Sequence, residues 1–385
     1  MTPFRLFVAA VVAAPTLVAQ TTWIVDAAAG PGAAFTDLPP AFAVALADDT
    51  VLVRSGTYSG GETRAGIRLQ FEPGADLGMA QTISVRDLRA GERFLFVGGR
   101  RSSLADTQPV FIAEQCEGQV VVDRLVTAAV AIFFQSPQVR VRNCAEVAFT
   151  GCDVGGSRPL EVERSQVVLT DSAVRSFDIN APALVARDAQ LIVGETTIRG
   201  ADGTVVGYSG VGLRLERSSA LVTGSGERGI AAGLSCRRFG GVICTPTQVP
   251  AAEIVQSQWV VDPRVPIGIV SGPRPVRRGI PALRANGGPL GGELSTDLWS
   301  HAGGSAWLVA SVPTPLQWTP WGPLGLSANH VVLDARSVAP GERVPLILPI
   351  APSLFPAEGA LTLQAVVLDV DGQLGLSNPA SVVLF

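Results

Sequence analysis

The sequence contains no lysine, so all 29 of its basic residues are arginine. The chain can therefore have no Schiff-base lysine, no lysine general base and no phosphate-binding lysine of a P-loop. Histidine is also scarce, because only His301 and His330 occur, and they lie too far apart in the sequence to indicate a metal site. No Ser–His–Asp set, glycine-rich phosphate loop or zinc-ligand spacing is present, and we predict no catalytic residue, no metal and no cofactor.

An excess of positive charge and long apolar runs are missing as well. The formal net charge of −4 gives no electrostatic reason to expect nucleic-acid binding. Beyond residue 20 no apolar segment reaches the roughly 20 residues of a membrane-spanning helix. Residues 1–19 have the features of a secretory signal peptide, with Arg5 near the start, then an apolar run, then small residues up to Ala19. We expect cleavage near Ala19 and a secreted or cell-surface protein without a membrane span.

A short strand motif is repeated along the chain, whose 42 glycines and 28 prolines favour strands and turns over helices. Five segments have apolar residues at their first and third positions: Phe111–Glu114, Val139–Arg142, Leu160–Glu163, Leu184–Arg187 and Leu213–Glu216. Their fourth position alternates in sign: Glu114, Arg142, Glu163, Arg187 and Glu216. The segments start roughly 20–30 residues apart, which is the length of one coil of a β-solenoid.

The alternation of charge predicts that these strands stack in register. Alternate residues of a strand point to opposite faces, so the fourth positions face solvent. Stacked strands bring equivalent residues to about 4.8 Å, where opposite charges attract by about 0.2–1 kcal/mol and like charges repel. Such short connections leave no room for crossover helices and exclude a doubly wound α/β fold, whereas a different all-β fold stays open.

Each repeat also contains a second strand and two sets of turn residues. The second strands have pairs of apolar residues at Val120/Val122, Val147/Phe149, Val167/Leu169, Leu191/Val193 and Ala220/Val222. The turn after the first strand is marked by Asn143, Arg164, Asp188 and Arg217. Small residues suited to a tight bend follow the second strand at Cys152, Ser172, Thr196 and Ser225.

The N-terminal part predicts a cap for the solenoid. The spacing of Leu38, Phe42 and Leu46 predicts a short amphipathic helix within residues 36–47, with Thr36 or Asp37 as its N-cap. It is flanked by strand-like residues 23–26, 51–53 and 56–58. A helix here would cover the open end of the sheets.

These N-terminal segments resemble the first coil of right-handed parallel β-helix proteins of the pectate-lyase-like group. The resemblance covers residues 21–245, although Asp48 stands where the group usually has glycine. It implies an all-β fold, a right-handed parallel β-helix with a short N-terminal capping helix. The group includes lyases, hydrolases, esterases, adhesins and non-catalytic surface proteins, so the resemblance implies no particular activity.

The remainder of the chain reads as a second domain. Residues 246–292 are rich in proline and glycine and are predicted to be a linker leading into that domain. Residues 293–385 contain strand-like runs and predict a small antiparallel β-sandwich. These runs are 306–311, 331–333, 344–348, 361–368 and 380–385. The last part resembles a β-rich terminal module found on many exported bacterial proteins.

The five cysteines suit an oxidising compartment and suggest two disulfides. Cys116 and Cys144 fall in one column of the repeats, within the Cα separation that a disulfide requires. Cys236 and Cys244 bracket a loop that a bridge could close. Cys152 would then remain unpaired, and buried free thiols are an open alternative for the first pair.

Few residues suggest chemistry. The Gly-His-Gly hydrolase motif and the Trp-Ile-Asp-His lyase segment of the pectate-lyase-like group are absent. Acidic residues of the repeats, namely Asp123, Asp153, Asp171, Asp178 and Asp188, read as bend and ladder residues or as parts of a site. The tryptophans Trp318 and Trp321 could form a stacking platform for sugar rings, or they could pack in an interface. Asp371-Gly372 fits a hairpin turn or the start of an incomplete calcium loop.

From these features we expect an exported, non-catalytic β-helix protein that serves surface attachment or glycan binding, with an extracellular polysaccharide or a cell-surface glycan as partner. A polysaccharide lyase or glycoside hydrolase acting on an extracellular polymer is the second hypothesis. A purely structural envelope component is the third.

Overall fold

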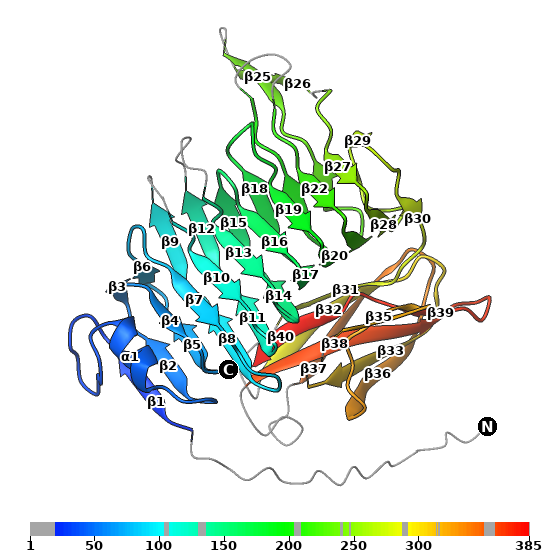
Figure 1. The fold of residues 1–385 in the computed structure, drawn as a ribbon. Helices are drawn as coiled ribbons and strands as arrows, with labels where there is room; N and C mark the ends of the chain where they lie inside the picture. The colour runs from blue at the N-terminus through cyan, green and yellow to red at the C-terminus, as the bar shows by residue number, and fades with distance from the viewer. Residues whose placement is uncertain are drawn as a thin grey trace, which may run out of the picture.

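The computed structural model describes residues 20–103, 108–129, 136–203, 209–238, 242–245, 248–286, 292–312, 314, 316–349 and 359–384. These residues form three long parallel sheets, a group of antiparallel strands and one short helix (Figure 1). The all-β fold with stacked parallel strands agrees with the prediction from the sequence. The predicted signal peptide, residues 1–19, lies outside the described residues. No helix within the described residues has the length and apolarity to cross a membrane.

Each coil between residues 50 and 255 contributes one strand to sheet A, one to sheet B and one to sheet C, in that order. Sheet A contains β1 (Thr22–Val25), β2 (Thr50–Val53), β5 (Arg68–Phe71), β8 (Arg93–Val97), β11 (Gln119–Asp123), β14 (Glu146–Thr150), β17 (Gln166–Thr170), β20 (Gln190–Gly194), β23 (Ser219–Thr223), β28 (Gln258–Val261) and β30 (Val276–Arg277). Sheet B contains β3 (Gly56–Tyr58), β6 (Ala75–Leu77), β9 (Arg100–Ser103), β12 (Val126–Ala129), β15 (Asp153–Gly156), β18 (Ala173–Ser176), β21 (Thr197–Arg199) and β24 (Ile230–Ala231). Sheet C contains β4 (Gly61–Thr63), β7 (Ile83–Arg86), β10 (Phe111–Glu114), β13 (Val139–Arg142), β16 (Leu160–Glu163), β19 (Leu184–Arg187), β22 (Leu213–Glu216), β27 (Ala252–Val255) and β29 (Val270–Ser271).

The five repeated segments are neighbouring strands of sheet C, paired in the predicted register. Glu114 lies opposite Arg142, Arg142 opposite Glu163, and Arg187 between Glu163 and Glu216. The Arg142 Nε atom lies 3.2 Å from the Glu163 carboxylate, and the Arg187 Nε atom lies 3.0 Å from that of Glu216. The charge alternation therefore reports stacking of coils, as predicted.

The interior of the solenoid is filled by the inward side chains of all three sheets. Phe94, Phe96 and Phe111 are fully buried, and the Phe96 and Phe111 rings meet edge to face with centroids 5.8 Å apart. Sheet A uses the second apolar pairs of the repeats, and sheet B adds a third strand to each coil that the sequence patterns did not indicate. A continuous apolar column thus runs the length of the coils.

Two tight corners in each coil are built by residues with positive φ. The corner from sheet C to sheet A has Asn143, Arg164, Asp188 and Arg217 at φ 46–51°, as expected for the predicted turn. The residue after each of these four corners either carries a hydroxyl group or donates its backbone N–H to a hydroxyl group of the next coil. The Cys144 N–H donates to Ser165 Oγ at 2.9 Å, for example. These hydroxyls satisfy backbone N–H groups that the corner removes from the sheet ladders.

The N-terminal end is covered by α1 (Leu38–Val44). Asp37 is the N-cap, and its Oδ1 atom accepts hydrogen bonds from the backbone N–H groups of Leu38 and Ser59, both at 2.9 Å. Leu38 and Phe42 are buried against the first coils, whereas Leu46, expected on the helix, follows its end and is 71% exposed. The cap is present as predicted but is shorter.

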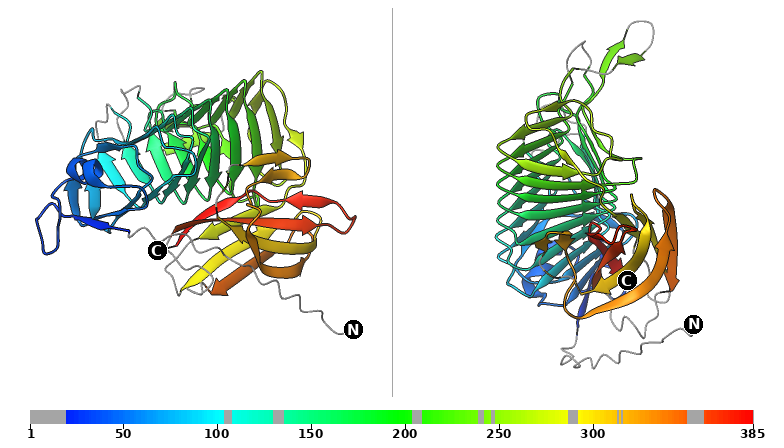
Figure 2. Two further views of the ribbon diagram at one scale, coloured as in Figure 1. Left: turned by 60° about the horizontal axis from the view of Figure 1, so that its bottom comes forward. Right: turned by 90° about the vertical axis from the view of Figure 1, so that its right-hand side faces the viewer.

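The solenoid continues beyond residue 245, through much of the segment expected to be a linker. An antiparallel hairpin, β25 (Ser235–Arg238) and β26 (Val242–Thr245), projects from the coils (Figure 2). Strands β27 and β28 then add a coil in register with β22 and β23. The proline- and glycine-rich composition concealed this coil, although residues 252–255 repeat the apolar first and third positions.

The C-terminal residues form a β-sandwich of two antiparallel sheets, as predicted. One sheet contains β31 (Ala282–Asn286), β32 (Glu293–Trp299) and β37 (Arg343–Pro349). The other contains β33 (Gly304–Ser311), β36 (His330–Val338), β38 (Gly359–Leu368), β39 (Leu374–Leu376) and β40 (Ala380–Leu384). Leu298, Leu308, Leu346 and Leu363 pack between the sheets.

The sandwich packs against the outward face of sheet A (Figures 1 and 2). Every middle outward residue from β8 to β20 is apolar, and together these residues form one row: Leu95, Val121, Ala148, Val168 and Ile192. Leu316, Ala360 and Val383 of the sandwich cover this row. Thr150 Oγ1 also donates to the Ser381 carbonyl at 2.9 Å. The two parts therefore share a buried interface.

Candidate functional site

The two tryptophans singled out in the sequence lie on one small hairpin of the C-terminal part. This tryptophan hairpin, residues 317–324, pairs β34 (Gln317–Thr319) with β35 (Gly322–Leu324). Thr319 fixes the turn, because its Oγ1 atom donates to the Gly322 carbonyl at 2.7 Å and accepts from the Trp321 N–H at 3.2 Å. Trp318 is 43% exposed and Trp321 is 49% exposed. Much of each ring is therefore free to meet a ligand.

The tryptophan hairpin is held on both sides. On the solenoid side, Trp318 Nε1 donates to Gln190 Oε1 at 2.7 Å, and Gln190 is the first residue of β20. On the sandwich side, the Leu376 N–H donates to the Trp321 carbonyl at 3.1 Å. Arg278 adds a contact of 3.4 Å to the Pro320 carbonyl. The tryptophans thus occupy a fixed position beside sheet A.

A row of polar residues runs along sheet A past this hairpin. The polar row consists of Gln166, Gln190, Ser219 and Gln258, which are register partners in β17, β20, β23 and β28. Gln190 and Gln258 are exposed, and the other two are half-buried. The sequence analysis missed this row, although a polar residue precedes the apolar pair in each second strand. That recurrence is the signal that would have found it.

Amides, hydroxyls and exposed indole rings together can bind a sugar. Gln and Ser side chains both donate and accept hydrogen bonds, as sugar hydroxyls do. A tryptophan ring buries apolar area against the C–H face of a flat ligand. The tryptophan hairpin and the polar row supply both kinds of contact on one surface.

The polar row ends at a buried carboxylate. Glu146, the outward residue of β14 in the same column, is 5% exposed. Its carboxylate accepts from Gln119 Nε2 at 2.6 Å and from the Leu316 N–H at 3.2 Å. Burial raises the pKa of Glu146 to about 7, although these hydrogen bonds and the charge of Arg93 oppose the rise. Glu146 therefore joins the solenoid to the sandwich and cannot meet a ligand in this position.

The acidic residues considered for catalysis do not form a carboxylate pair. Asp153 receives Arg175 Nη2 on both oxygens, at 2.6 Å to Oδ1, and Asp123 receives Arg124 Nε at 2.8 Å. Asp188 pairs with Arg217 at 2.7 Å. Asp171 pairs with Arg228 at 2.7 Å and with Arg284 at 3.1 Å. Asp178 Oδ1 accepts a hydrogen bond from the Asn180 N–H at 2.9 Å. The Arg217 guanidinium also lowers the pKa of Asp188. These carboxylates behave as ladder and turn residues.

The residues considered for calcium binding, Asp369 and Asp371, lie in a hairpin turn. Asp369 Oδ1 accepts from the N–H groups of Asp371 and Gln373, at 3.0 and 2.7 Å, so Asp371-Gly372 lies in the hairpin turn between β38 and β39. Within the described residues no three His, Cys, Asp or Glu side chains are grouped so as to hold a metal ion.

The cysteines fall into two groups: buried free thiols in the solenoid and the two cysteines of the β25–β26 hairpin. Cys116 and Cys144 lie in one column, as expected, but both are free in the structure, and so is Cys152. The proposed bridge between Cys116 and Cys144 is therefore absent. Their Sγ atoms instead contact backbone carbonyls, those of Glu114 at 3.4 Å and Arg142 at 3.3 Å. Cys244 is disulfide-bonded and lies in register with Cys236 across β25 and β26.

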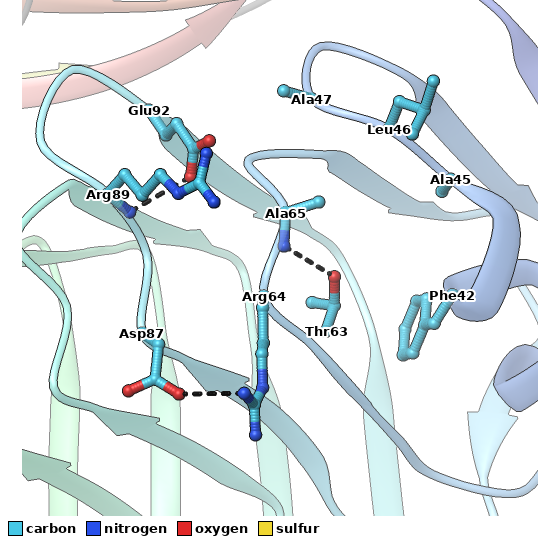
Figure 3. Close-up of a pocket in the computed structure, with 10 residues that line it drawn as sticks. All are labelled: Phe42, Ala45, Leu46, Ala47, Thr63, Arg64, Ala65, Asp87, Arg89 and Glu92. Carbon is cyan, nitrogen blue, oxygen red and sulfur yellow. Dashed lines mark hydrogen bonds and ion pairs between the residues drawn. The ribbon is translucent and has the colours of Figure 1, made fainter.

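A separate hollow of about 490 Å³ lies beside the N-terminal cap (Figure 3). Phe42, Leu46 and neighbouring alanines form one wall, and charged side chains form the other (Figure 3). Arg64 is paired with Asp87 at 3.5 Å, and Glu92 accepts from the Arg89 N–H at 3.1 Å. The sequence analysis did not indicate this hollow.

Comparison of this chain with protein-family models, with curated proteins and with solved structures gives no match. The geometry of its own residues is therefore the basis for assigning a function.

Proposed function

We propose that this chain is an exported, non-catalytic β-helix protein that attaches to glycans through the tryptophan hairpin. The signal-like residues 1–19 and the resemblance of the first coil to pectate-lyase-like proteins support export and an extracellular polymer as partner. Pairing of the solenoid carboxylates with arginine supports a binding role, because a glycosidase needs two carboxyl groups that flank the scissile bond.

One observation carries the proposal. Trp318 and Trp321 are exposed large aromatic residues on a short hairpin, and Trp318 is fixed to the solenoid by its bond to Gln190. A rigidly held aromatic side chain loses little conformational freedom when a ligand stacks on it. Packing alone would leave less of both rings in solvent. The tryptophan hairpin therefore has the properties of a recognition element.

A glycan array probed with the purified full chain tests the proposal. We expect binding to at least one extracellular polysaccharide, weakened about tenfold or more by Trp318→Ala because the stacking surface is lost. Phe177→Ala is the matched control, since Phe177 is 40% exposed but follows β18 and packs beside Gly155 of sheet B, and it should bind as the wild type does. Thermal unfolding of both variants shows whether the fold is retained. Wild-type binding by a folded Trp318→Ala protein would refute the proposal.

The absence of catalysis is tested on the same polymers. Incubation with each bound polysaccharide should release neither new reducing ends nor unsaturated products. If the wild type forms new reducing ends and a solenoid variant does not, the protein is a hydrolase. If the wild type forms unsaturated products and the variant does not, the protein is a lyase. Either result would refute the non-catalytic function.

A further inference from the structure

The polar row offers a ligand a series of equally spaced contacts. Gln166, Gln190, Ser219 and Gln258 lie on consecutive coils, so neighbours are separated by about 4.8 Å along the solenoid axis. An extended linear glycan advances by nearly the same distance with each sugar. A glycan chain parallel to the solenoid axis could therefore place one sugar beside each residue of the row.

The row carries no net charge of its own, and the charged residues at the corners that precede it are paired with one another. Arg217 and Asp188, at the corners that precede Ser219 and Gln190, form a bidentate ion pair at 2.7 and 2.8 Å. Arg164, at the corner before Gln166, pairs with Glu163 at 3.1 Å. Amide and hydroxyl groups match the hydroxyls of a neutral sugar, whereas carboxylate groups of an acidic glycan call for unpaired arginines.

The position of Trp318 fixes where a sugar ring can stack. Its indole N–H binds Gln190, so the ring lies at the second residue of the row. Beyond Gln166 the column is closed, because Glu146 is buried and bound to the Leu316 N–H. In the other direction Gln258 is exposed on β28. The Gln166 Nε2 atom is buried as well, so the accessible part of the column runs from Gln190 through Ser219 to Gln258, with the aromatic contact at its closed end.

We propose that the ligand is a neutral, linear glycan that lies parallel to the solenoid axis along the polar row, with one sugar stacked on Trp318. This proposal rests on the glycan-binding function proposed above and specifies the class of glycan and its direction. It makes Gln258 a contact for the third or fourth sugar and not for the first two.

Isothermal titration of the full chain tests the length and the charge of the ligand. The probes are β-1,4-linked oligomers of glucose, N-acetylglucosamine and mannose with two to eight sugars, and oligogalacturonate as the acidic probe. In one neutral series the affinity should rise about tenfold from two to four sugars and change by less than about twofold beyond five. Oligogalacturonate of equal length should bind about tenfold more weakly.

Substitution of Gln258 tests the direction. Gln258→Ala should weaken the tetrasaccharide about three- to tenfold, the loss of one or two hydrogen bonds, and leave the disaccharide unchanged. Gln373→Ala removes an exposed glutamine from the β38–β39 turn, outside the polar row, and should change neither affinity. Because Gln258 is exposed, both variants should unfold at the wild-type temperature, and Gln258→Glu provides a second substitution if they do not.

The possible failures are distinguishable. If glycans bind in a Trp318-dependent way but neither chain length nor Gln258 affects the affinity, the axial arrangement is overturned and the glycan-binding function stands. Preference for oligogalacturonate would overturn the neutral class. If no glycan binds the wild type, both proposals fall.

Discussion

Sheets A and C belong to the same coils, but their outward faces have opposite characters. On sheet C the outward residues carry alternating charges, and the ion pairs between coils are partly open to solvent. On sheet A the middle outward residues are apolar and are covered by the sandwich. One repeating backbone therefore supports two kinds of contact, namely ion pairs between coils on sheet C and an apolar interface with the sandwich on sheet A. Charges in register report stacking of coils, whereas an apolar row reports a second part of the chain that lies on it.

The largest difference between the faces should appear when a charge is placed on each. Ile192→Asp buries an unpaired carboxylate between sheet A and the sandwich and should lower the free energy of unfolding by about 3–5 kcal/mol, measured by urea denaturation. Val255→Asp is the matched control, because Val255 is an outward residue of sheet C and is 44% exposed. A loss below about 1 kcal/mol for Ile192→Asp would show that the interface is not buried in solution.

A smaller loss in the free energy of unfolding is expected where the side-chain amide of Asn378, in the sandwich, meets Gly194 of the solenoid. Asn378 Nδ2 donates to the Leu283 carbonyl at 2.8 Å, and its Oδ1 atom accepts from the Leu283 N–H at 2.9 Å. A Cβ atom at Gly194 would lie 2.5 Å from Asn378 Nδ2. Gly194→Ala should therefore destabilise the protein by about 2 kcal/mol. In a protein that already carries Asn378→Ala, the further change Gly194→Ala should have little effect on the free energy of unfolding. If the effects of the two substitutions simply add, Asn378 does not contact Gly194.

Glu146 makes the interface on sheet A sensitive to pH. Its folded-state pKa, about 7, is above its ordinary value of 4.5, so its contribution to stability is fully present below pH 4.5 and is lost as the pH rises through 7. Between pH 5 and pH 9 the wild type should lose about 2–3 kcal/mol relative to Glu146→Gln. Urea denaturation of both proteins at each pH measures this difference. A difference that is independent of pH would mean that Glu146 is ionised throughout.

The smallest effect belongs to the charged face. Arg187→Glu places a carboxylate beside those of its neighbours, since Arg187 contacts Glu161 at 2.6 Å and Glu216 at 3.0 Å and lies opposite Glu163. We expect a loss of about 1 kcal/mol at low salt that shrinks in 1 M salt, because these pairs are partly solvated. Arg274→Glu, at an exposed position outside the ladder, should have almost no effect. A loss that persists in high salt would indicate packing of the Arg187 side chain instead.

The register of sheet C could be predicted because opposite charges in neighbouring strands reveal their pairing directly. Most of sheet B could not be predicted, because its strands are short and several bury a single apolar residue, such as Val154, Val174 or Ile198, so they show no alternation. The additional coil of β27 and β28 was hidden by surrounding proline and glycine. Composition concealed its apolar alternation.

The candidate site was predictable by residue type but not by its surroundings. Trp318 was singled out because tryptophan suits sugar stacking, whereas its exposure could not be predicted from the sequence. Its partner Gln190 is 128 residues away in the sequence, and no local pattern joins the two. The same holds for the interface, where Val168 and Ile192 are covered by Leu316 and Val383. Contacts between distant segments depend on how the sandwich docks, which periodicity within one strand does not encode.

The two tight corners of each coil determine where the solenoid can vary. Both are fixed by positive-φ residues and by hydroxyls bound to the neighbouring coil, so an inserted residue there would break contacts above and below. One connection from sheet B to sheet C accommodates the β25–β26 hairpin, so this edge of the solenoid already contains an inserted element. Foreign loops grafted into the β25–β26 hairpin, which projects from the coils, should therefore leave the stacked strands intact, which makes this edge the natural place to give the scaffold new specificities.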